Sequence, residues 1–391
     1  EPVERASRAL KKFTRISESE IVTPEFVADK IISGLPENAI DNNTMLLDIA
    51  SKQGEFVYAV YKKFGKAVAN NFYSIPTSKT AYEFTRKVYK LLDLDVNQIE
   101  ANYTSYDLIN ENNFIENETI KINNKEMKFN VIVGNPPYQM RKEGTSDNPI
   151  YHLFMDIAYK LSDKITLITP GRFLFNAGKT PKDWNEKMLN DEHLKVISYD
   201  SKSSDVFPDI DLKGGIAITL RDKKQVFEKI KVFSQFEELN SILQRVLKTS
   251  DFESIEGLVY TQNKFDLETL YNDYPQFKKI IGSDGREKRL TTSIFSQLSF
   301  FSEEKKSTND IEILGLINNI RKYRYVPLKY LEKHNNLNDY KIILPKSNGT
   351  GAFGEALSTP LIGNPLVGYT QSSISIGSFK TNNEAMSCLK Y

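Results

Sequence analysis

An apolar segment that leads directly into Asn-Pro-Pro-Tyr, FNVIVGNPPY at residues 129–138, decides how this sequence folds. Its branched apolar side chains favour a β-strand over residues 129–133. A strand does not continue through two consecutive prolines, because proline lacks the backbone N–H that a β-ladder needs. The pattern therefore predicts a buried strand, followed by a loop at its carboxyl end that begins at Asn135.

Further strands alternate with helices on both sides of this segment, over about 200 residues. The expected strands are residues 44–50, 71–75, 99–103, 129–133, 165–169, 194–199 and 215–220. Such alternation predicts an α/β fold with a mostly parallel, doubly wound sheet. Ligands bind at the carboxyl ends of the strands in such sheets. We therefore expect the loops after Ala50, near Asp107 and after Val133 to meet in one crevice.

The alternation ends near residue 222, which we take as a domain boundary. Residues 1–20 are charged and compatible with an N-terminal helical extension, and residues 21–222 form the first predicted domain. Residues 223–391 form a second domain with a mixed α+β pattern, which stops in what reads as the start of an amphipathic helix. We therefore expect a truncated C-terminus, and the start without Met points the same way.

The composition excludes several classes of protein. Of the 391 residues, 40% are hydrophobic and 26% are charged, as in ordinary globular domains. No apolar run reaches the roughly 18 to 20 residues that a membrane span needs. One cysteine, Cys388, and three histidines make a disulfide framework impossible and a metal site unexpected. The default compartment is a reducing cytoplasm.

The net charge is close to zero, since 52 Lys and Arg residues face 51 Asp and Glu residues. Proteins that bind nucleic acids usually carry a basic surface, so the sum alone argues against such a partner. The distribution of charge matters more than its sum. If the chain binds a nucleic acid, we expect the cations of residues 286–289, 321–329 and 341–346 to line one cleft.

The Asn-Pro-Pro-Tyr segment carries groups that suit an amino group attached to an aromatic ring. The lone pair of such an amino group is delocalised, and the nitrogen is a poor nucleophile. The Asn135 side-chain carbonyl and the Pro136 backbone carbonyl could accept its two hydrogens and localise the lone pair. Tyr138 offers a flat face for a base, worth roughly 1–3 kcal/mol. The plainer alternative is a Pro-Pro turn with a tyrosine in the core.

With the segments before it, this motif resembles the S-adenosylmethionine-dependent DNA N6-adenine methyltransferases of the γ motif order, of the type II or IIG restriction-modification kind. Thr23-Pro24 resembles their N-terminal cofactor-contact motif, and residues 47–56 resemble their first cofactor loop. The resemblance implies a seven-stranded Rossmann-like sheet in residues 21–222 and a target-recognition domain in residues 223–391.

The resemblance also assigns roles to individual residues. The implied catalytic residues are Asn135, Pro136, Pro137 and Tyr138. The implied cofactor-binding residues are Thr23, Pro24, Asp48, Ala50, Gly54, Phe56, Asp107 and Asn135. No metal is implied. One departure is clear, because residues 72–78 lack the carboxylate that binds the cofactor's ribose in the family.

Later segments extend the resemblance toward DNA. Phe207 corresponds to an aromatic residue that packs on the target base together with Tyr138, although an ordinary buried phenylalanine would look the same. The implied DNA contacts are Lys213, Arg321, Arg324 and Lys346. Solvated loops and helix faces are the alternatives for these cations.

The resemblance implies methylation of N6 of a flipped-out adenine in double-stranded DNA, as part of a restriction-modification system. A nuclease or helicase region is expected in a longer parent chain or in a partner subunit. Two alternatives stay open. The enzyme could act on an RNA base or a protein glutamine, or the chain could be a non-catalytic DNA-recognition subunit.

Overall fold

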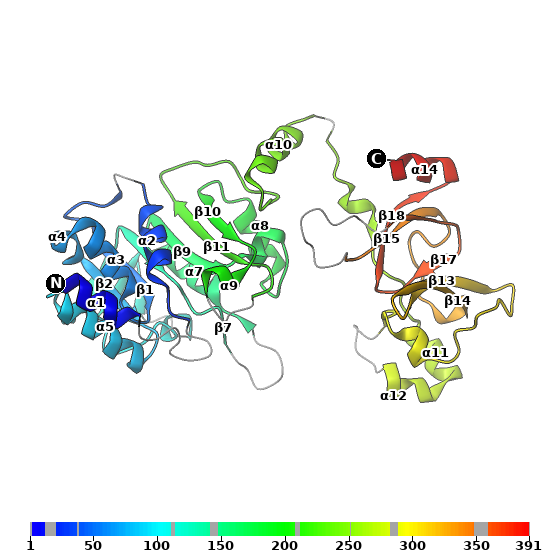
Figure 1. Ribbon diagram of the computed structural model, residues 1–391, viewed down its shortest axis with the longest axis horizontal. Helices are drawn as coiled ribbons and strands as arrows, with labels where there is room; N and C mark the ends of the chain where they lie inside the picture. Colours follow the sequence, from blue (N-terminus) through cyan, green and yellow to red (C-terminus); the bar gives the residue numbers. More distant parts are fainter. Residues whose placement is uncertain are drawn as a thin grey trace. The chain divides into compact units, whose positions relative to one another are not determined.

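The computed structural model describes residues 2–11, 21–36, 39–110, 114–140, 148–207, 212–250, 252–281, 288–347 and 359–390. The chain divides into two compact units, Glu1–Thr249 and Ser250–Tyr391, which are described separately (Figure 1). No helix among the described residues is both long and apolar enough for a membrane span.

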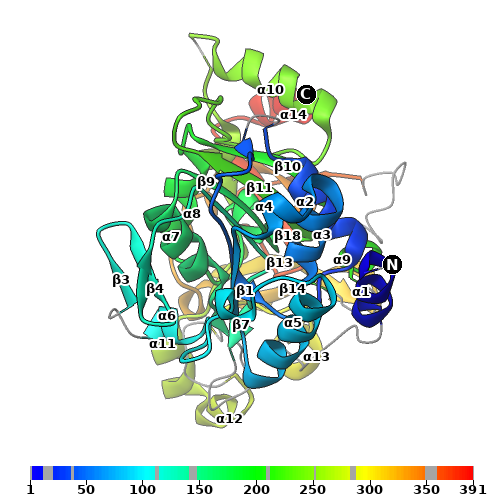
Figure 2. The same cartoon turned by 90° about the vertical axis from the view of Figure 1, so that its left-hand side faces the viewer.

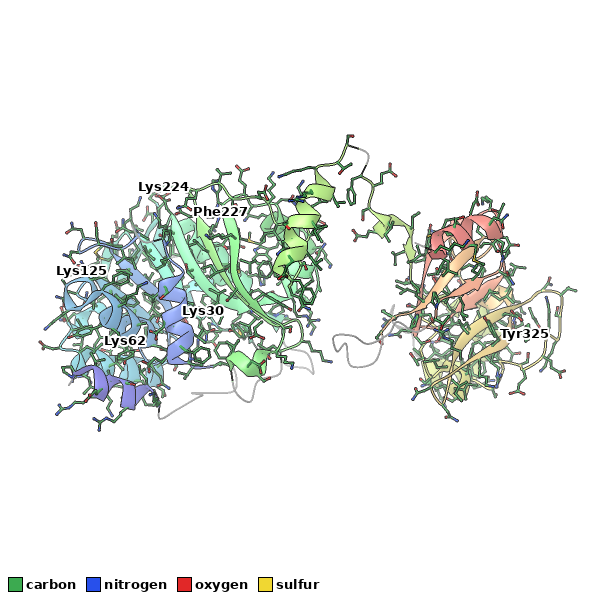
Figure 3. The ribbon with its side chains drawn as sticks, turned by 45° about the horizontal axis from the view of Figure 1, so that its top comes forward. Lys30, Lys62, Lys125, Lys224, Phe227 and Tyr325 are labelled. Atoms are coloured by element: carbon green, nitrogen blue, oxygen red, sulfur yellow. The ribbon has the colours of Figure 1, made fainter. Side chains whose placement is uncertain are left out.

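The boundary predicted near residue 222 is wrong, because the chain beyond that point still belongs to the first unit. Phe227 (Figure 3) donates its backbone N–H to the carbonyl of Glu192, and the ammonium of Lys195 lies 4.9 Å from the centre of its ring. Phe233 packs edge-on against Phe175 and Tyr199. These contacts join residues far apart in sequence, so the local change of pattern did not reveal them.

The first unit is built on a six-stranded sheet with the order β10-β11-β9-β6-β1-β2. Its strands are β1 (Leu46–Ser51), β2 (Phe72–Pro76), β6 (Val131–Gly134), β9 (Lys164–Pro170), β10 (Leu194–Asp200) and β11 (Ile216–Asp222). β11 runs antiparallel to both of its neighbours, and the other strands share one direction. The mostly parallel sheet that the alternation predicts is therefore present.

One of the seven predicted strands, at residues 99–103, is not a regular strand. Ile99 makes a single parallel bridge with Ser74 of β2. Beyond it, the backbone N–H groups of Glu100 and Ser105 donate to the carbonyls of Ser74 and Pro76. The chain therefore runs along β2 without forming a continuous β-ladder with it. Where the ladder is interrupted, the Glu100 carboxylate accepts the backbone N–H groups of Asn102 and Asn123.

Helices cover both faces of this sheet (Figure 2). The helices of the first unit are α1 (Pro2–Leu10), α2 (Glu25–Ser33), α3 (Glu55–Phe64), α4 (Lys66–Ala69), α5 (Lys79–Leu91), α6 (Asp107–Asn110), α7 (Tyr151–Leu161), α8 (Lys182–Leu189), α9 (Ser203–Val206) and α10 (Glu237–Leu247), of which α10 lies away from the sheet. In Figure 2, α2, α3 and α5 lie on one side of the sheet and α7 and α8 on the other.

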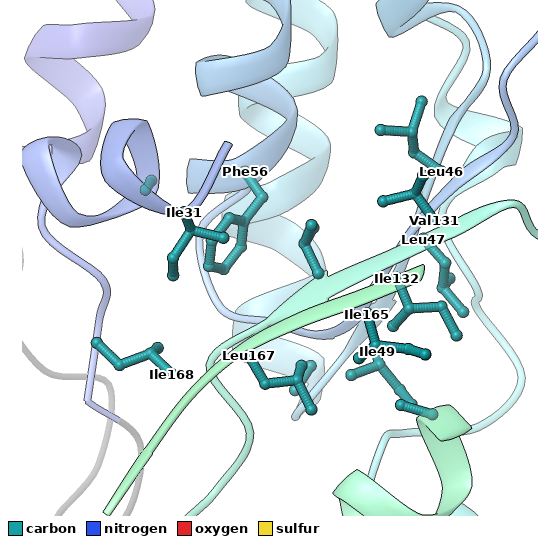
Figure 4. Packing of buried hydrophobic residues seen from close by; sticks show 14 of the residues in the cluster. Ile31, Leu46, Leu47, Ile49, Phe56, Val131, Ile132, Ile165, Leu167 and Ile168 are labelled. Atoms are coloured by element: carbon teal, nitrogen blue, oxygen red, sulfur yellow. The ribbon is translucent and has the colours of Figure 1, made fainter. Parts of the chain in front are cut away.

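The core of the first unit lies between the sheet and these helices. Every residue of β1 and β6 is buried, as expected for parallel strands covered on both faces. Figure 4 shows apolar side chains of β1, β6 and β9 packed with Ile31 of α2 and Phe56 of α3. α1 also joins this core through the buried Ala6, so the N-terminal residues belong to the first unit.

The second unit combines short helices with two small sheets. One sheet has the order β12-β18-β15-β16 and the other the order β14-β13-β17. The strands are β12 (Val259–Tyr260), β13 (Asp310–Ile317), β14 (Ile320–Pro327), β15 (Tyr340–Pro345), β16 (Leu361–Gly363), β17 (Val367–Tyr369) and β18 (Ser373–Phe379). The helices are α11 (Leu267–Asp273), α12 (Lys278–Ile281), α13 (Ile294–Gln297) and α14 (Asn382–Lys390).

Candidate active site

The carboxyl ends of β1, β2 and β6 meet at one edge of the first unit's sheet. Asp48 of β1 lies in register between Ser74 of β2 and Val133 of β6. The turn from β1 to α3 and the loop that begins at Asn135 therefore start side by side. This arrangement brings together two of the three loops that the sequence predicts to converge. The third loop, near Asp107, is attached to the same end of β2, because the N–H of Ser105 donates to the carbonyl of Pro76.

Asn135 is buried, with only 1% of its surface exposed. Its Nδ2 donates hydrogen bonds to the carbonyl of Ile21 (3.1 Å) and to Oγ1 of Thr23 (3.2 Å). Nζ of Lys52 donates to its backbone carbonyl. Its side-chain oxygen, Oδ1, is buried and has no partner among the described residues. The site therefore contains an oriented hydrogen-bond acceptor that the protein itself does not use.

The close fit between β6 and β1 depends on Gly134. A Cβ at this position would lie 3.1 Å from Cγ2 of Ile49 and 3.5 Å from Oδ1 of Asp48. A side chain at this position would therefore require Ile49 to shift by a few tenths of an ångström beside Asp48. Glycine at this position keeps Asn135 close to Asp48.

The turn from β1 to α3 holds Asp48, Ala50, Gly54 and Phe56. Gly54 has a φ of +81°, which favours glycine. Oδ1 of Asp48 accepts the N–H of Ala50 (3.1 Å), whereas its Oδ2 is buried without a partner. Burial, and then the charge of Glu55, raise the pKa of Asp48 to about 8. Phe56 is buried in the core, so its side chain anchors the end of this turn in the hydrophobic interior.

Two charged residues of this turn, Lys52 and Glu55, were not among the predicted site residues. Both are almost fully buried. The carboxylate of Glu55 accepts the N–H of Thr23 (3.1 Å) and the N–H of Gln53 (2.8 Å). Glu55 therefore ties the N-terminal segment to the turn from β1 to α3. Charged residues directly between a buried apolar strand and the apolar start of a helix were the available signal in the sequence.

Thr23, Pro24 and Phe207 line one cavity of about 560 Å³. Tyr58 of α3 and Glu55 also line it. The structure thus brings the Thr-Pro motif and the late aromatic residue together beside Asn135.

Tyr138 and Phe207 are neighbours, but they do not face each other. Their ring centres are 6.4 Å apart and their planes meet at 68°. A flat base cannot stack on both rings at this angle, so the predicted sandwich is not preformed. The hydroxyl of Tyr138 is buried without a partner, and burial raises its pKa above the usual range.

Asp107 lies apart from the cavity at Thr23. Its Oδ2 accepts the N–H (2.7 Å) and the hydroxyl (2.9 Å) of Thr104, so it caps its own turn. It lines a different cavity of about 510 Å³ together with Pro76, Ser78 and Glu100. The sequence pattern did not reveal this local cap, because a capping aspartate and a ligand-binding aspartate look alike.

Several buried polar atoms at this edge of the sheet have no partner within the part of the chain that the structure describes. They are Oδ2 of Asp48, Oγ1 of Thr77, Oγ of Ser105, Oδ1 of Asn135 and the hydroxyl of Tyr138. Buried polar groups are normally hydrogen-bonded, so a cluster of exceptions indicates a place for a polar ligand. S-adenosylmethionine carries an ammonium group, ribose hydroxyls and an adenine amino group, and these donors fit the acceptors present.

The predicted DNA contacts lie in both units. Lys213 is exposed in the turn before β11, and Lys346 is exposed directly after β15. Arg321 and Arg324 lie on β14, where Arg321 donates to the carbonyl of Thr359 and Arg324 forms an ion pair with Glu303. An ion-paired arginine is less available to a phosphate than a free one.

The sequence predicts that three groups of cations line one cleft. Arg286 lies outside the described residues, and the prediction is wrong for Lys341. Lys341 is fully buried, and its Nζ donates to the carbonyls of Leu337, Asn364 and Val367. Lys341 therefore joins three backbone carbonyls inside the second unit instead of lining a surface. In the sequence, Lys341 begins the apolar run Lys-Ile-Ile-Leu, and this position was the sign that the lysine points inward.

Comparison with known proteins gives two matches in sequence. Residues 70–207 match the family described as Eco57I restriction-modification methylase. A relative from Mycoplasma pneumoniae, an uncharacterized adenine-specific methylase, is 32% identical over 126 residues, which are 31% of this chain and 30% of the relative. The matched segment thus spans less than a third of the relative's length.

Solved structures show weaker likenesses. The methyltransferase subunit of a type I restriction-modification system from Streptococcus thermophilus is 13% identical, with a TM-score of 0.40, over 52% of this chain and 45% of that one. An O-methyltransferase from Bacillus cereus in complex with SAH is 12% identical, with a TM-score of 0.36, over 56% of this chain and 90% of that one.

The family match runs from just before β2 to Phe207, so it includes Asn-Pro-Pro-Tyr and leaves out Thr23 and Asp48. The family match over this segment is consistent with the unpaired acceptor atom of Asn135, which follows the end of β6. Residues 70–207, about a third of the chain, are therefore similar to the Eco57I restriction-modification methylases.

Proposed function

We propose that this protein transfers a methyl group from S-adenosylmethionine to N6 of adenine in double-stranded DNA, as the modification activity of a restriction-modification system. The observation that carries the proposal is the buried, unpaired Oδ1 of Asn135 at the start of an Asn-Pro-Pro-Tyr segment. The family match over residues 70–207 and the adenine-specific methylase relative support it.

Asn135 and Pro136 would activate the target amino group. Oδ1 of Asn135 accepts one of its hydrogens and the backbone carbonyl of Pro136 accepts the other. Both bonds favour a nitrogen whose lone pair is localised and directed away from the ring. No general base is needed before attack, because the nitrogen loses a proton only after it has become cationic.

The cofactor supplies a methyl group bound to a cationic sulfur, and the carboxyl edge of the sheet would hold it. Asp48 offers its free Oδ2 to a donor group of the cofactor. The hydroxyls of Thr77 and Ser105 take the place of the missing ribose-binding carboxylate, since both are buried without partners directly beside β2. Most of the acceleration then comes from positioning the two reactants.

The adenine has to leave the duplex, because its N6 is paired inside the base stack. Tyr138 receives one face of the flipped base, and Phe207 reaches the other face after one of the two rings turns. The second unit would read the DNA sequence, with Arg321 and Lys346 among its phosphate contacts. A nuclease or helicase region, in the same protein or in a partner, would complete the restriction system.

The destination of the methyl group tests this proposal. The protein is incubated with S-adenosylmethionine labelled in its methyl group and with unmodified genomic DNA, RNA and protein in parallel. We expect the label on N6 of adenine in DNA, within one sequence context. Label on cytosine, on RNA or on protein alone would overturn the proposal. Calorimetry that detects no cofactor binding would favour a non-catalytic subunit.

A further inference from the structure

We propose that Thr23 is a positioning residue for Asn135, in addition to any contact that its backbone makes with a ligand. Its hydroxyl and the carbonyl of Ile21 hold the Asn135 amide in the one orientation that directs Oδ1 toward the target amino group. The inference rests on the proposed function for the role of Oδ1. It concerns a residue that lies outside the family match, which begins at residue 70.

The hydrogen bonds determine which way the amide faces. Nδ2 of Asn135 lies 3.1 Å from the carbonyl oxygen of Ile21 and 3.2 Å from Oγ1 of Thr23. A carbonyl oxygen can only accept, so the atom that faces Ile21 must be the NH2 group. Oδ1 then points to the other side of the amide, where it is buried and unpaired.

Without these bonds, both orientations of the amide would be accessible. The terminal torsion of asparagine is broad and roughly two-fold, so rotation by half a turn is not prevented by its rotamer preference. In the reversed orientation, the NH2 of Asn135 would face the NH2 of the adenine, with donor against donor. Activation of the substrate therefore requires that the NH2 group be fixed on the side away from it.

Thr23 is itself held in place from the cofactor loop. Its N–H donates to Oε1 of Glu55 (3.1 Å), whose Oε2 accepts the N–H of Gln53 (2.8 Å). Pro24 directly follows and precedes the first residue of α2, with φ at −58°. Thr23 and Glu55 are both buried. The backbone of Thr23 is thus held by the bond to Glu55 and by the start of α2. Removal of the Thr23 hydroxyl therefore need not displace this backbone.

The test compares Thr23→Val, which keeps the shape and removes the hydroxyl, with Thr23→Ser, which keeps the hydroxyl. The matched control is Thr44→Val, which removes the hydroxyl that bonds Asp41 just before the opposite end of β1. We measure kcat and KM on DNA, the cofactor Kd by calorimetry and the melting temperature. For T23V we expect kcat to fall about three- to tenfold, as one net hydrogen bond implies. Cofactor Kd should stay within about twofold, and T23S should recover most of kcat. T44V, which loses two hydrogen bonds to Asp41, should lower the melting temperature and keep the wild-type kcat and cofactor Kd.

Three outcomes would overturn the positioning role. T23V with a weakened cofactor Kd and an unchanged kcat would make Thr23 a cofactor contact only. T23V with wild-type kcat would show that Ile21 suffices. A parallel loss of kcat and melting temperature in both T23V and T23S would indicate a purely structural residue.

A second readout does not depend on methylation. Hydrogen exchange of the ¹⁵N-labelled Asn135 side-chain NH2, assigned by comparison with N135D, should be slow in wild type and T23S and faster in T23V. If this pattern appears while no DNA is methylated, the proposed function fails and the positioning of Asn135 stands. If the exchange rates of the three proteins are equal, the positioning role is wrong even where methylation occurs.

Discussion

Each of the two units buries a lysine, and the surroundings of the two ammonium groups differ. Lys341 of the second unit donates to the carbonyls of Leu337, Asn364 and Val367, all of which belong to its own unit's scaffold. Lys52 of the first unit donates to the carbonyl of Asn135, and its charge opposes the pKa rise of Asp48. The comparison teaches that burial of a charge does not by itself indicate a functional site. Among the described residues, unpaired buried atoms lie in both units, Oδ1 of Asn135 and Oδ2 of Asp48 in the first and Oδ1 of Asn336 in the second. The difference is that Lys52 lies at the carboxyl ends of the parallel strands β1 and β6.

Replacement of Lys52 by Met should produce the largest effect on activity in this comparison. It removes the donor to the Asn135 backbone and the cation beside Asp48. We expect kcat to fall about 10- to 100-fold, the range for a hydrogen bond from a charged group. Steady-state kinetics on DNA measures the loss. If K52M keeps full activity, Lys52 is a structural residue like Lys341, and the two buried lysines do not differ in function.

Replacement of Lys341 by Met should act on stability instead. Its three carbonyl partners would lose their donor inside the second unit, at a cost of about 1–3 kcal/mol in the free energy of unfolding. Denaturant unfolding of the full chain should show the change in the second unit's transition. The cofactor Kd should stay at the wild-type value. Weakened cofactor binding in K341M would break the distinction between the two lysines.

The pH dependence of stability should run in opposite directions in the two units. The pKa of Asp48 is raised from 3.8 to about 8, so the folded first unit binds more protons, and its stability falls as pH rises through that window. Burial lowers the pKa of Lys341 from 10.5 to about 8, so the second unit gains stability as pH rises from about 8 to 10.5. Each slope is at most about 1.4 kcal/mol per pH unit.

Melting curves between pH 5 and pH 10 can measure both trends. D48N should reduce the pH dependence of the first unit's stability, and K341M should reduce that of the second unit's stability. Equal slopes in wild type and D48N would mean that Asp48 titrates in the folded protein as it does in the unfolded chain.

An exposed lysine should show the smallest effect. Lys346 lies at the surface directly after β15, and K346A would remove one expected phosphate contact. We expect DNA binding to weaken similarly for all sequences, and the salt dependence of log K to lose about one unit of slope. Titration of DNA at several salt concentrations measures this. An unchanged salt slope would remove Lys346 from the DNA-binding surface.

Much of the first unit could be predicted from sequence because its strands have a strong local pattern. The apolar run before Asn135 and the run before Ser51 are buried strands, and parallel pairing then places their ends side by side. The segment at residues 99–103 was harder, because its ladder with β2 is interrupted at Glu100.

The rest depends on contacts between residues distant in sequence. No local pattern shows that Thr23 and Glu55 meet, or that Asn135 donates to Ile21. The same holds for Phe227, which extends the first unit beyond the predicted boundary. Sequence patterns indicated which residue types carry the chemistry, and the packing decides how they are oriented.

The central claim is that Oδ1 of Asn135 accepts a hydrogen from the adenine amino group during methyl transfer. The most direct measurement is a single-turnover reaction on unmodified DNA with cofactor already bound, with N6-methyladenine quantified by mass spectrometry. Wild type should form N6-methyladenine, and N135A should form it about 10²–10³ times more slowly with an unchanged cofactor Kd. Equal rates in both proteins, or a methylated product other than N6-methyladenine, would contradict the account.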